Sequence, residues 1–507
     1  MTSKPSSSEA SRFLRTDHLK ANLKQRSVRG GLITLSAQPI RIGLSFLVNV
    51  VLARMLTPQD YGLVGMVTAI TGLISLFKDL GLTAATIQRE EINHQQVSTL
   101  FWVNVFLGCA TALVTVVLAP VIANFYNEPR LIPITLTLAV GFLFSGLGAQ
   151  HAALLNRQME FTQLVLNDIL SQIIGIGVAI TAAWYGLGYW ALVIFPLLSA
   201  AVSTIGYWIA CDWRPGLPAR KVGVRSLLSF GANLTGFGIV NYFARNLDNI
   251  LIGRFWGAQE LGLYTKAYQL LLLPLNQINS PIASVAIPVL SRLADSPMRY
   301  RQVYLRVLEK IVLITMPLVV FMLATSDWLV ELLLGKQWSG ASNIFMLLGV
   351  AGVLQPIANT TGWLFISQGR TRHMFQWGII GSSILVVSFL VGLPWGAIGV
   401  ASAYSILFTL VLLPILFWFT GRTGPVRTGD FYKTTAPIAL ASMCPALVLI
   451  GFRAYFTIEN PIIGCTISLA ITTISFLIAL STFKIGRTAI RDMKEIILLL
   501  KAQKNSN

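Results

Sequence analysis

Long apolar stretches follow one another along most of the sequence, separated by short segments that hold most of its charged and turn-forming residues. A helix needs about 20 apolar residues to cross the hydrocarbon core of a bilayer. Backbone polar groups in that layer must be satisfied within the chain, so we expect each stretch to be helical. We predict about fourteen spans, at residues 31–54, 61–82, 97–124, 130–154, 162–184, 188–210, 227–254, 262–288, 303–325, 341–366, 374–391, 396–419, 432–453 and 462–482.

The composition excludes a soluble protein. Hydrophobic residues make up 54% of the chain and charged residues 11%, whereas a soluble domain carries about 25% charged residues. Because so few charges cannot coat a soluble particle, the apolar surface must face lipid, and we expect an all-α polytopic membrane protein. The turn between spans 374–391 and 396–419 is very short, so a twelve-span fold that merges or drops one pair is the competing arrangement.

The charge is strongly basic, with 38 Lys and Arg against 20 Asp and Glu, a net charge of +18. In a soluble protein this excess would suggest nucleic acid, but the cytoplasmic loops of membrane proteins also collect Lys and Arg. With the N-terminus in the cytoplasm, most of these residues fall on the cytoplasmic side. We therefore expect both termini inside and no nucleic-acid partner. Residues 1–29 lack an apolar stretch and are expected to be a disordered basic arm, and residues 485–507 a basic tail.

One segment occurs twice in the chain. NVVLARMLTPQDYGL begins at Asn49, and the similar segment NILIGRFWGAQELGL begins at Asn249. The two align without a gap. Six predicted spans lie between the copies, an even number, so both insert in the same direction, as in transporters built from two parallel repeats. We expect an N-lobe of spans 1–6 at residues 30–212, a C-lobe of spans 7–12 at residues 213–420, and two additional spans at residues 421–484. The lobes would be related by a pseudo-two-fold axis along the membrane normal.

Polar side chains recur at helical spacing inside the first and seventh spans, so that each set lies on one helical face. In the first span this stripe consists of Gln38, Arg41, Ser45 and Asn49. In the seventh span it consists of Asn241, Arg245 and Asn249. A charged side chain at the bilayer centre costs about 2.5–3.5 kcal/mol on insertion scales. We therefore expect both stripes to face a wet cationic cavity between the lobes.

The basic residues of these spans are candidate substrate contacts. Arg41 and Arg245 occupy the two stripes, and Lys266 lies in the eighth span, where it either joins the cavity or snorkels to the outer interface. Lys78 stands at the inner end of the second span, and we expect it to snorkel to the inner interface.

Three acids inside the predicted spans, Asp79, Asp168 and Asp248, are candidates for ion coupling or ion pairing. Asp248 lies three residues from Arg245 and could neutralise it. Arg41 has no acid within one turn of its own helix, which favours a cargo contact for its charge.

No sequence pattern points to a metal, a cofactor or catalysis. The four Cys and four His are scattered without metal-ligand spacing. The predicted outer loops are short and poor in candidate catalytic acids, Arg and His. We therefore expect no enzyme, and a membrane glycan polymerase or glycosyltransferase is the remote alternative.

Three stretches carry a resemblance to a known family: VLARMLTPQDYGLVGMV, LFKDLGLTAATIQRE and DNILIGRFWGAQELGLYTKAYQLLLLPL. Over about residues 30–485 the chain resembles the polysaccharide transporter family of Wzx-type flippases, in particular the branch that serves exported or capsular polysaccharides. That family belongs to the multidrug/oligosaccharidyl-lipid/polysaccharide exporter superfamily.

The resemblance implies a flippase of the cell inner membrane that works by alternating access of two lobes. Its expected cargo is a polyprenyl-diphosphate-linked oligosaccharide unit for exopolysaccharide, capsule or lipopolysaccharide synthesis, moved from the cytoplasmic to the outer leaflet while its polyprenyl tail stays in the membrane lipid. A polysaccharide polymerase and a chain-length regulator are candidate partners. The alternatives within the superfamily are a lipid II-type flippase and a cation-coupled multidrug antiporter. Antiporters tend to use acidic membrane residues, whereas the bases here equal or outnumber the acids, which favours an anionic cargo.

Overall fold

A computed structural model describes residues 23–78, 81–89, 92–219 and 224–483 of the chain, except for the side chains of residues 23–28, 224–241 and 244. Within these ranges the regular structure is entirely helical. The chain divides into two compact units, residues 1–262 and 263–507.

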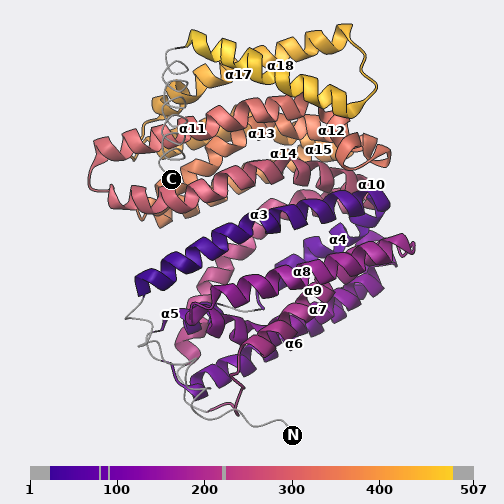
Figure 1. The fold of residues 1–507 in the computed structure, drawn as a ribbon, viewed down its shortest axis with the longest axis vertical. Helices are drawn as coiled ribbons and strands as arrows, with labels where there is room; N and C mark the ends of the chain where they lie inside the picture. The colour runs from indigo at the N-terminus through magenta and orange to yellow at the C-terminus, as the bar shows by residue number, and fades with distance from the viewer. Residues whose placement is uncertain (1–22, 79–80, 90–91, 220–223, 484–507) are drawn as a thin grey trace, which may run out of the picture. The chain divides into compact units, whose positions relative to one another are not determined.

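The first unit contains seven complete helices and the first part of an eighth within its described residues (Figure 1, indigo to magenta). They are α3 (Leu23–Met55), α4 (Pro58–Ser75), α5 (Leu82–Gln88), α6 (His94–Tyr126), α7 (Leu131–Arg157), α8 (Phe161–Trp184), α9 (Trp190–Ala210) and the beginning of α10 (Val224–Arg292).

Close packing in the first unit joins α6 to α7, α8 to α9, α7 to α9 and α3 to α8. Glycines permit the tightest of these contacts: a Cβ on Gly108 of α6 would lie 2.8 Å from the Phe142 carbonyl oxygen, and one on Gly146 of α7 would lie 2.7 Å from the Asn104 carbonyl oxygen. Small residues let two helix backbones approach closely. This matters in a membrane because helices there associate through van der Waals packing rather than through the hydrophobic effect.

The turn between α6 and α7 is held by its own side chains. Asn127 ends α6 in the left-handed conformation, with φ 54°. The Arg130 guanidinium then donates two hydrogen bonds of 2.8 Å to the Glu128 carboxylate. These bonds hold the pKa of Glu128 below its ordinary value.

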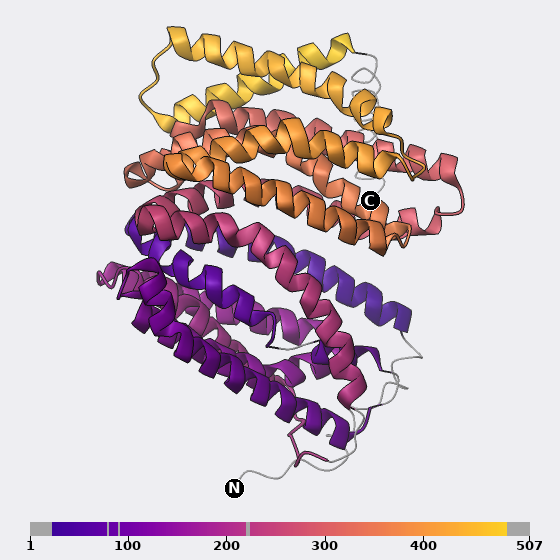
Figure 2. The same cartoon turned by 180° about the vertical axis from the view of Figure 1, so that it is seen from behind.

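The second unit contains the rest of α10 and the remaining elements (Figure 2, pink to yellow). They are α11 (Pro297–Ala324), α12 (Ser326–Leu333), η1 (Lys336–Trp338), α13 (Ser339–Ser367), α14 (Thr371–Gly392), η2 (Leu393–Trp395), α15 (Gly396–Leu407), η3 (Phe408–Leu412), α16 (Leu413–Gly421), α17 (Thr428–Tyr455) and α18 (Pro461–Thr482).

The core of the second unit lies where α11 packs against α13 and α17. Phe417 and Phe431 stack there with ring centroids 4.6 Å apart, and Tyr304 packs against Phe431. An ion pair fixes the start of α17, because Arg301 Nε donates to Asp430 Oδ2 at 2.7 Å and the Arg427 backbone N–H donates to the same oxygen at 2.8 Å.

The described helices confirm the fourteen-span prediction over the twelve-span arrangement. Eleven helical segments are long and apolar enough to cross a bilayer. Two of them belong to stretches that cover two predicted spans each. Thr371–Gly421 has 51 residues, more than twice the roughly 20 needed for one crossing, and is broken at η2. Arg245–Arg292 belongs to α10, which begins at Val224, has 69 residues and is broken at Gly257. The shorter α4 supplies the second predicted span and ends at Ser75, before the predicted limit.

The two copies of the repeated segment interrupt their helices differently. In the first copy the chain leaves α3 and begins α4 with a capping box: the Thr57 backbone N–H donates to Asp60 Oδ2 at 2.9 Å, and the Asp60 N–H donates to Thr57 Oγ1 at 3.3 Å. In the second copy the matching position is Gly257, which interrupts α10 with φ 84° and ψ −178°. A left-handed φ favours glycine because it has no Cβ.

The predicted limits at the ends of the chain and between the lobes stay predictions. Helix α3 begins at Leu23, inside the arm predicted for residues 1–29, while residues 1–22 and 484–507 lie outside the described part. The predicted lobe limit at residue 212 stays a prediction, since the compact units divide at residue 262 and the first part of α10 groups with the first unit.

Candidate functional site

Arg41 of α3 has an acidic partner on another helix. Its Nε lies 2.7 Å from Asp168 Oδ2 of α8, and the two side chains are 30% and 37% exposed. Gln172 Nε2 donates to the other Asp168 carboxylate oxygen at 3.2 Å. Asp168 is thus an ion-pairing acid. The spacing of residues along α3 does not identify Asp168 as the partner of Arg41, because the contact depends on how α3 packs against α8.

The remaining residues of the first predicted stripe differ in exposure. Gln38 and Ser45 are exposed, and Asn49 is half-buried with its Nδ2 donating to the Ser45 carbonyl oxygen at 2.8 Å. Gln38 and Ser45 are therefore not covered by other described parts of the protein.

The second stripe is partly described. Arg245 is exposed and Asn249 is half-buried, whereas Asp248 is 3% exposed and accepts a hydrogen bond from the Asn249 backbone N–H at 2.8 Å. The side chain of Asn241 lies outside the described part.

Lys266 and Asp79 are the two remaining predicted site residues. Lys266 belongs to the second unit and is 5% exposed, so its amine is buried in this structure. Asp79 lies outside the described residues.

The two copies of the repeat contact each other reciprocally. A Cβ on Gly62 would lie 1.6 Å from the Ala258 carbonyl oxygen, and a Cβ on Gly262 would lie 1.8 Å from the Pro58 carbonyl oxygen. Gly62 and Gly262 occupy matching places in the repeat, as do Pro58 and Ala258. Only glycine fits at either position, since both obstacles are backbone atoms. We call this contact the glycine crossing.

Tyr242 of α10 extends the contact along α4. Its hydroxyl lies 3.1 Å from the Thr68 carbonyl oxygen and 3.0 Å from the Ala69 carbonyl oxygen, to which it can donate. A Cβ on Gly72 would lie 2.1 Å from the same hydroxyl oxygen. The beginning of α10 is thereby held against α4 at two levels.

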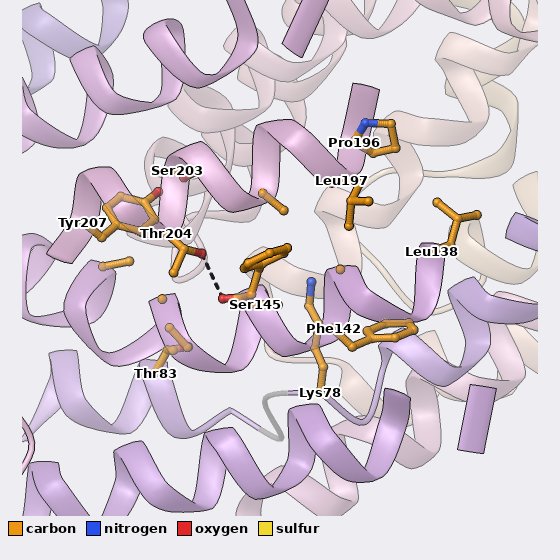
Figure 3. A pocket seen from close by; sticks show the side chains of 16 residues that line it. Lys78, Thr83, Leu138, Phe142, Ser145, Pro196, Leu197, Ser203, Thr204 and Tyr207 are labelled. Atoms are coloured by element: carbon orange, nitrogen blue, oxygen red, sulfur yellow. Dashed lines mark hydrogen bonds between the residues drawn. The ribbon is translucent and has the colours of Figure 1, made fainter. Parts of the chain in front are cut away.

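A cavity of about 520 Å³ lies between α7 and α9 in the first unit (Figure 3), and we call it the α7–α9 cavity. Its lining comes from the turn that follows α4, from α5, and from one face each of α7 and α9. The polar lining residues are Lys78, Thr83, Ser145, Ser203, Thr204 and Tyr207. Thr204 Oγ1 donates to the Phe144 carbonyl oxygen at 2.9 Å.

Lys78 contributes the charge of this cavity. Figure 3 shows its side chain extending from the turn after α4 toward the side of Phe142. The sequence predicted that Lys78 would snorkel to the interface, and its direction could not be read without the packing of α4 against α7. No carboxylate lines the cavity among the described residues.

Comparisons with known proteins agree on one family and one fold. The family model described as "Polysaccharide biosynthesis protein" matches residues 51–343. The chain is 28% identical to the lipopolysaccharide biosynthesis protein WzxC of Escherichia coli, over 78% of this chain and 81% of the relative. It is 29% identical to the teichuronic acid biosynthesis protein TuaB of Bacillus subtilis, over 73% of this chain and 76% of the relative.

The fold is also found among solved structures. The lipid II flippase MurJ, in an inward closed conformation, aligns with a TM-score of 0.72 at 17% identity and covers 91% of this chain and 100% of its own. At this identity the alignment establishes the common fold.

Proposed function

The chain belongs to the polysaccharide biosynthesis protein family, and we propose that it is a flippase for a polyprenyl-diphosphate-linked oligosaccharide unit in a bacterial inner membrane. The observation that carries this proposal is the similarity to WzxC and TuaB over more than 70% of each chain, since both relatives are named for the synthesis of polysaccharides. The MurJ-like fold supports it independently, because that protein is named as a flippase.

The chemistry of the polar residues suits this cargo. A diphosphate and an attached glycan must pass a layer in which an isolated charge costs several kcal/mol. We propose that Arg41, Arg245 and Lys266 lower this cost by contacting the diphosphate. Arginine can bind phosphate oxygens in a planar, bidentate geometry. Asp168, whose Oδ2 lies 2.7 Å from Arg41 Nε, is the counterion with which the diphosphate would compete for this guanidinium.

Alternating access would move the cargo without making or breaking a covalent bond. We propose that both termini are cytoplasmic, as the distribution of Lys and Arg suggests, which places the glycine crossing at the outer side. In this orientation the crossing closes the outer exit, and separating its helices opens it. A polymerase on the outer side would then consume the flipped unit.

Proteoliposomes test the proposal. Purified protein is reconstituted with a fluorescent, short-chain prenyl-diphosphate oligosaccharide, and the fraction that becomes accessible to an impermeant quencher is followed in time. We expect accelerated exchange between leaflets relative to protein-free vesicles. Equal rates with and without protein would contradict the flippase function. Parallel vesicles with a lipid II analogue or a cationic dye distinguish the two superfamily alternatives.

A further inference from the structure

We propose that the α7–α9 cavity is a binding subsite for the anionic sugar-phosphate end of the cargo, with Lys78 as its charged contact. The inference rests on the proposed function and adds a site within the first unit alone, separate from the predicted stripes on α3 and α10.

The dimensions of the cavity suit a small ligand. Its volume of about 520 Å³ lies in the range of roughly 300–1,000 Å³ that is usual for ligand sites. The lining extends from Leu138 to Ala152 on α7, about 20 Å at 1.5 Å per residue. Gly141 and Ala200 line the cavity with little or no side chain, and a Cβ on Gly141 would meet no atom within 4 Å.

Four of the polar lining residues come from two helices: Ser145 from α7, and Ser203, Thr204 and Tyr207 from α9. Ser145 and Tyr207 offer hydroxyls that make no hydrogen bond to another described residue. Ser203 is held in place from α8, since Asn167 Nδ2 donates to its carbonyl oxygen at 2.9 Å. Hydroxyl groups both donate and accept hydrogen bonds, as a sugar requires.

Aromatic and apolar groups complete the lining. Phe142, Phe144, Pro196 and Leu197 also line it, so the cavity combines apolar walls with a few polar groups. That combination is typical of small-molecule sites.

The charge selects an anion. Lys78 is exposed, and within the described residues it forms no ion pair. Its ammonium group offers three donors and no acceptor. With one cation and no carboxylate in the described lining, the cavity suits a phosphate or a uronate and disfavours a cationic drug. A phospholipid headgroup shares this chemistry, and the experiment separates the two sources.

Binding of citronellyl-diphosphate-linked N-acetylglucosamine to protein in nanodiscs of neutral lipid tests the site. We expect Lys78→Ala to weaken binding roughly tenfold, since a hydrogen bond to a charged group is lost, and Lys78→Arg to retain most of it. Ala200→Leu should also weaken binding by filling the cavity. Lys336→Ala is the matched control, because Lys336 is 89% exposed and far along the chain in the second unit. Thermal melting of each variant identifies any that is misfolded.

Three results would overturn the subsite. The first is unchanged affinity in folded Lys78→Ala and Ala200→Leu. The second is that inorganic diphosphate competes as well as the sugar-linked ligand, which would show that the cavity does not recognise the sugar. The third is equal competition by phosphatidylglycerol, which would make the cavity a phospholipid site. The leaflet-exchange assay on wild-type protein separates these failures from failure of the flippase function, since exchange persists if only the subsite is wrong.

Discussion

Substitution of Gly62 by alanine should force the glycine crossing apart. The added Cβ would lie 1.6 Å from the Ala258 carbonyl oxygen, whereas real Cβ contacts essentially never fall below 3.0 Å. The backbones must therefore separate by at least 1.4 Å, the difference between these values. Overpacking of this kind costs about 1–3 kcal/mol, which shifts a two-state equilibrium about 5-fold to 150-fold, since 1.4 kcal/mol is a factor of ten.

The same helix provides a control. A Cβ on Gly65 would lie 3.4 Å from Leu261 Cδ2, an ordinary contact with a side chain. Gly65→Ala should therefore leave the crossing closed, while Gly62→Ala and Gly262→Ala should open it.

Thiol labelling measures the opening. Leu261 is fully buried, so a cysteine at that position in a cysteine-free background should react slowly with an impermeant maleimide in intact cells. We expect Gly62→Ala to raise the labelling rate at least fivefold and to reduce transport. If Gly62→Ala and Gly65→Ala label and transport alike, the crossing is not a closure and the reasoning from its geometry is wrong.

Three further predictions concern charges and topology. Arg41→Ala should reduce transport roughly tenfold. Adding Asp168→Asn removes the carboxylate left without its arginine, and it should not restore transport. Recovery of transport in the double variant would show that Arg41 serves only as a counterion. With Cys-free protein in intact cells, Ser339→Cys should react with an impermeant reagent and Thr428→Cys should not, and the reverse pattern would invert the proposed orientation. Asp430→Ala should lower the free energy of unfolding by about 1–3 kcal/mol, because it removes a guanidinium contact and a backbone contact; an unchanged Tm would contradict a structural role for that ion pair.

The helices could be predicted from the sequence because span length and polarity are local properties. The prediction that the short turn before Gly396 separates two spans agrees with the structure, in which η2 interrupts the helix there and α15 begins at Gly396. The Arg41–Asp168 pair and the direction of Lys78 could not be predicted, because each depends on packing between helices distant in the chain. The repeat was visible in the sequence, but the contact between its copies was not, because like segments need not touch.

The contact between the copies has the form of an interface between identical subunits. In a two-fold dimer each patch meets its own counterpart, so one residue change alters two contacts at once. Here Gly62 meets Ala258 and Gly262 meets Pro58 within one chain, and a change at either glycine alters one contact only. The two sides can therefore diverge separately, as the capping box at Thr57 and the left-handed Gly257 already show. An internal duplication of this kind keeps the geometry of a symmetric pair while giving each side its own sequence.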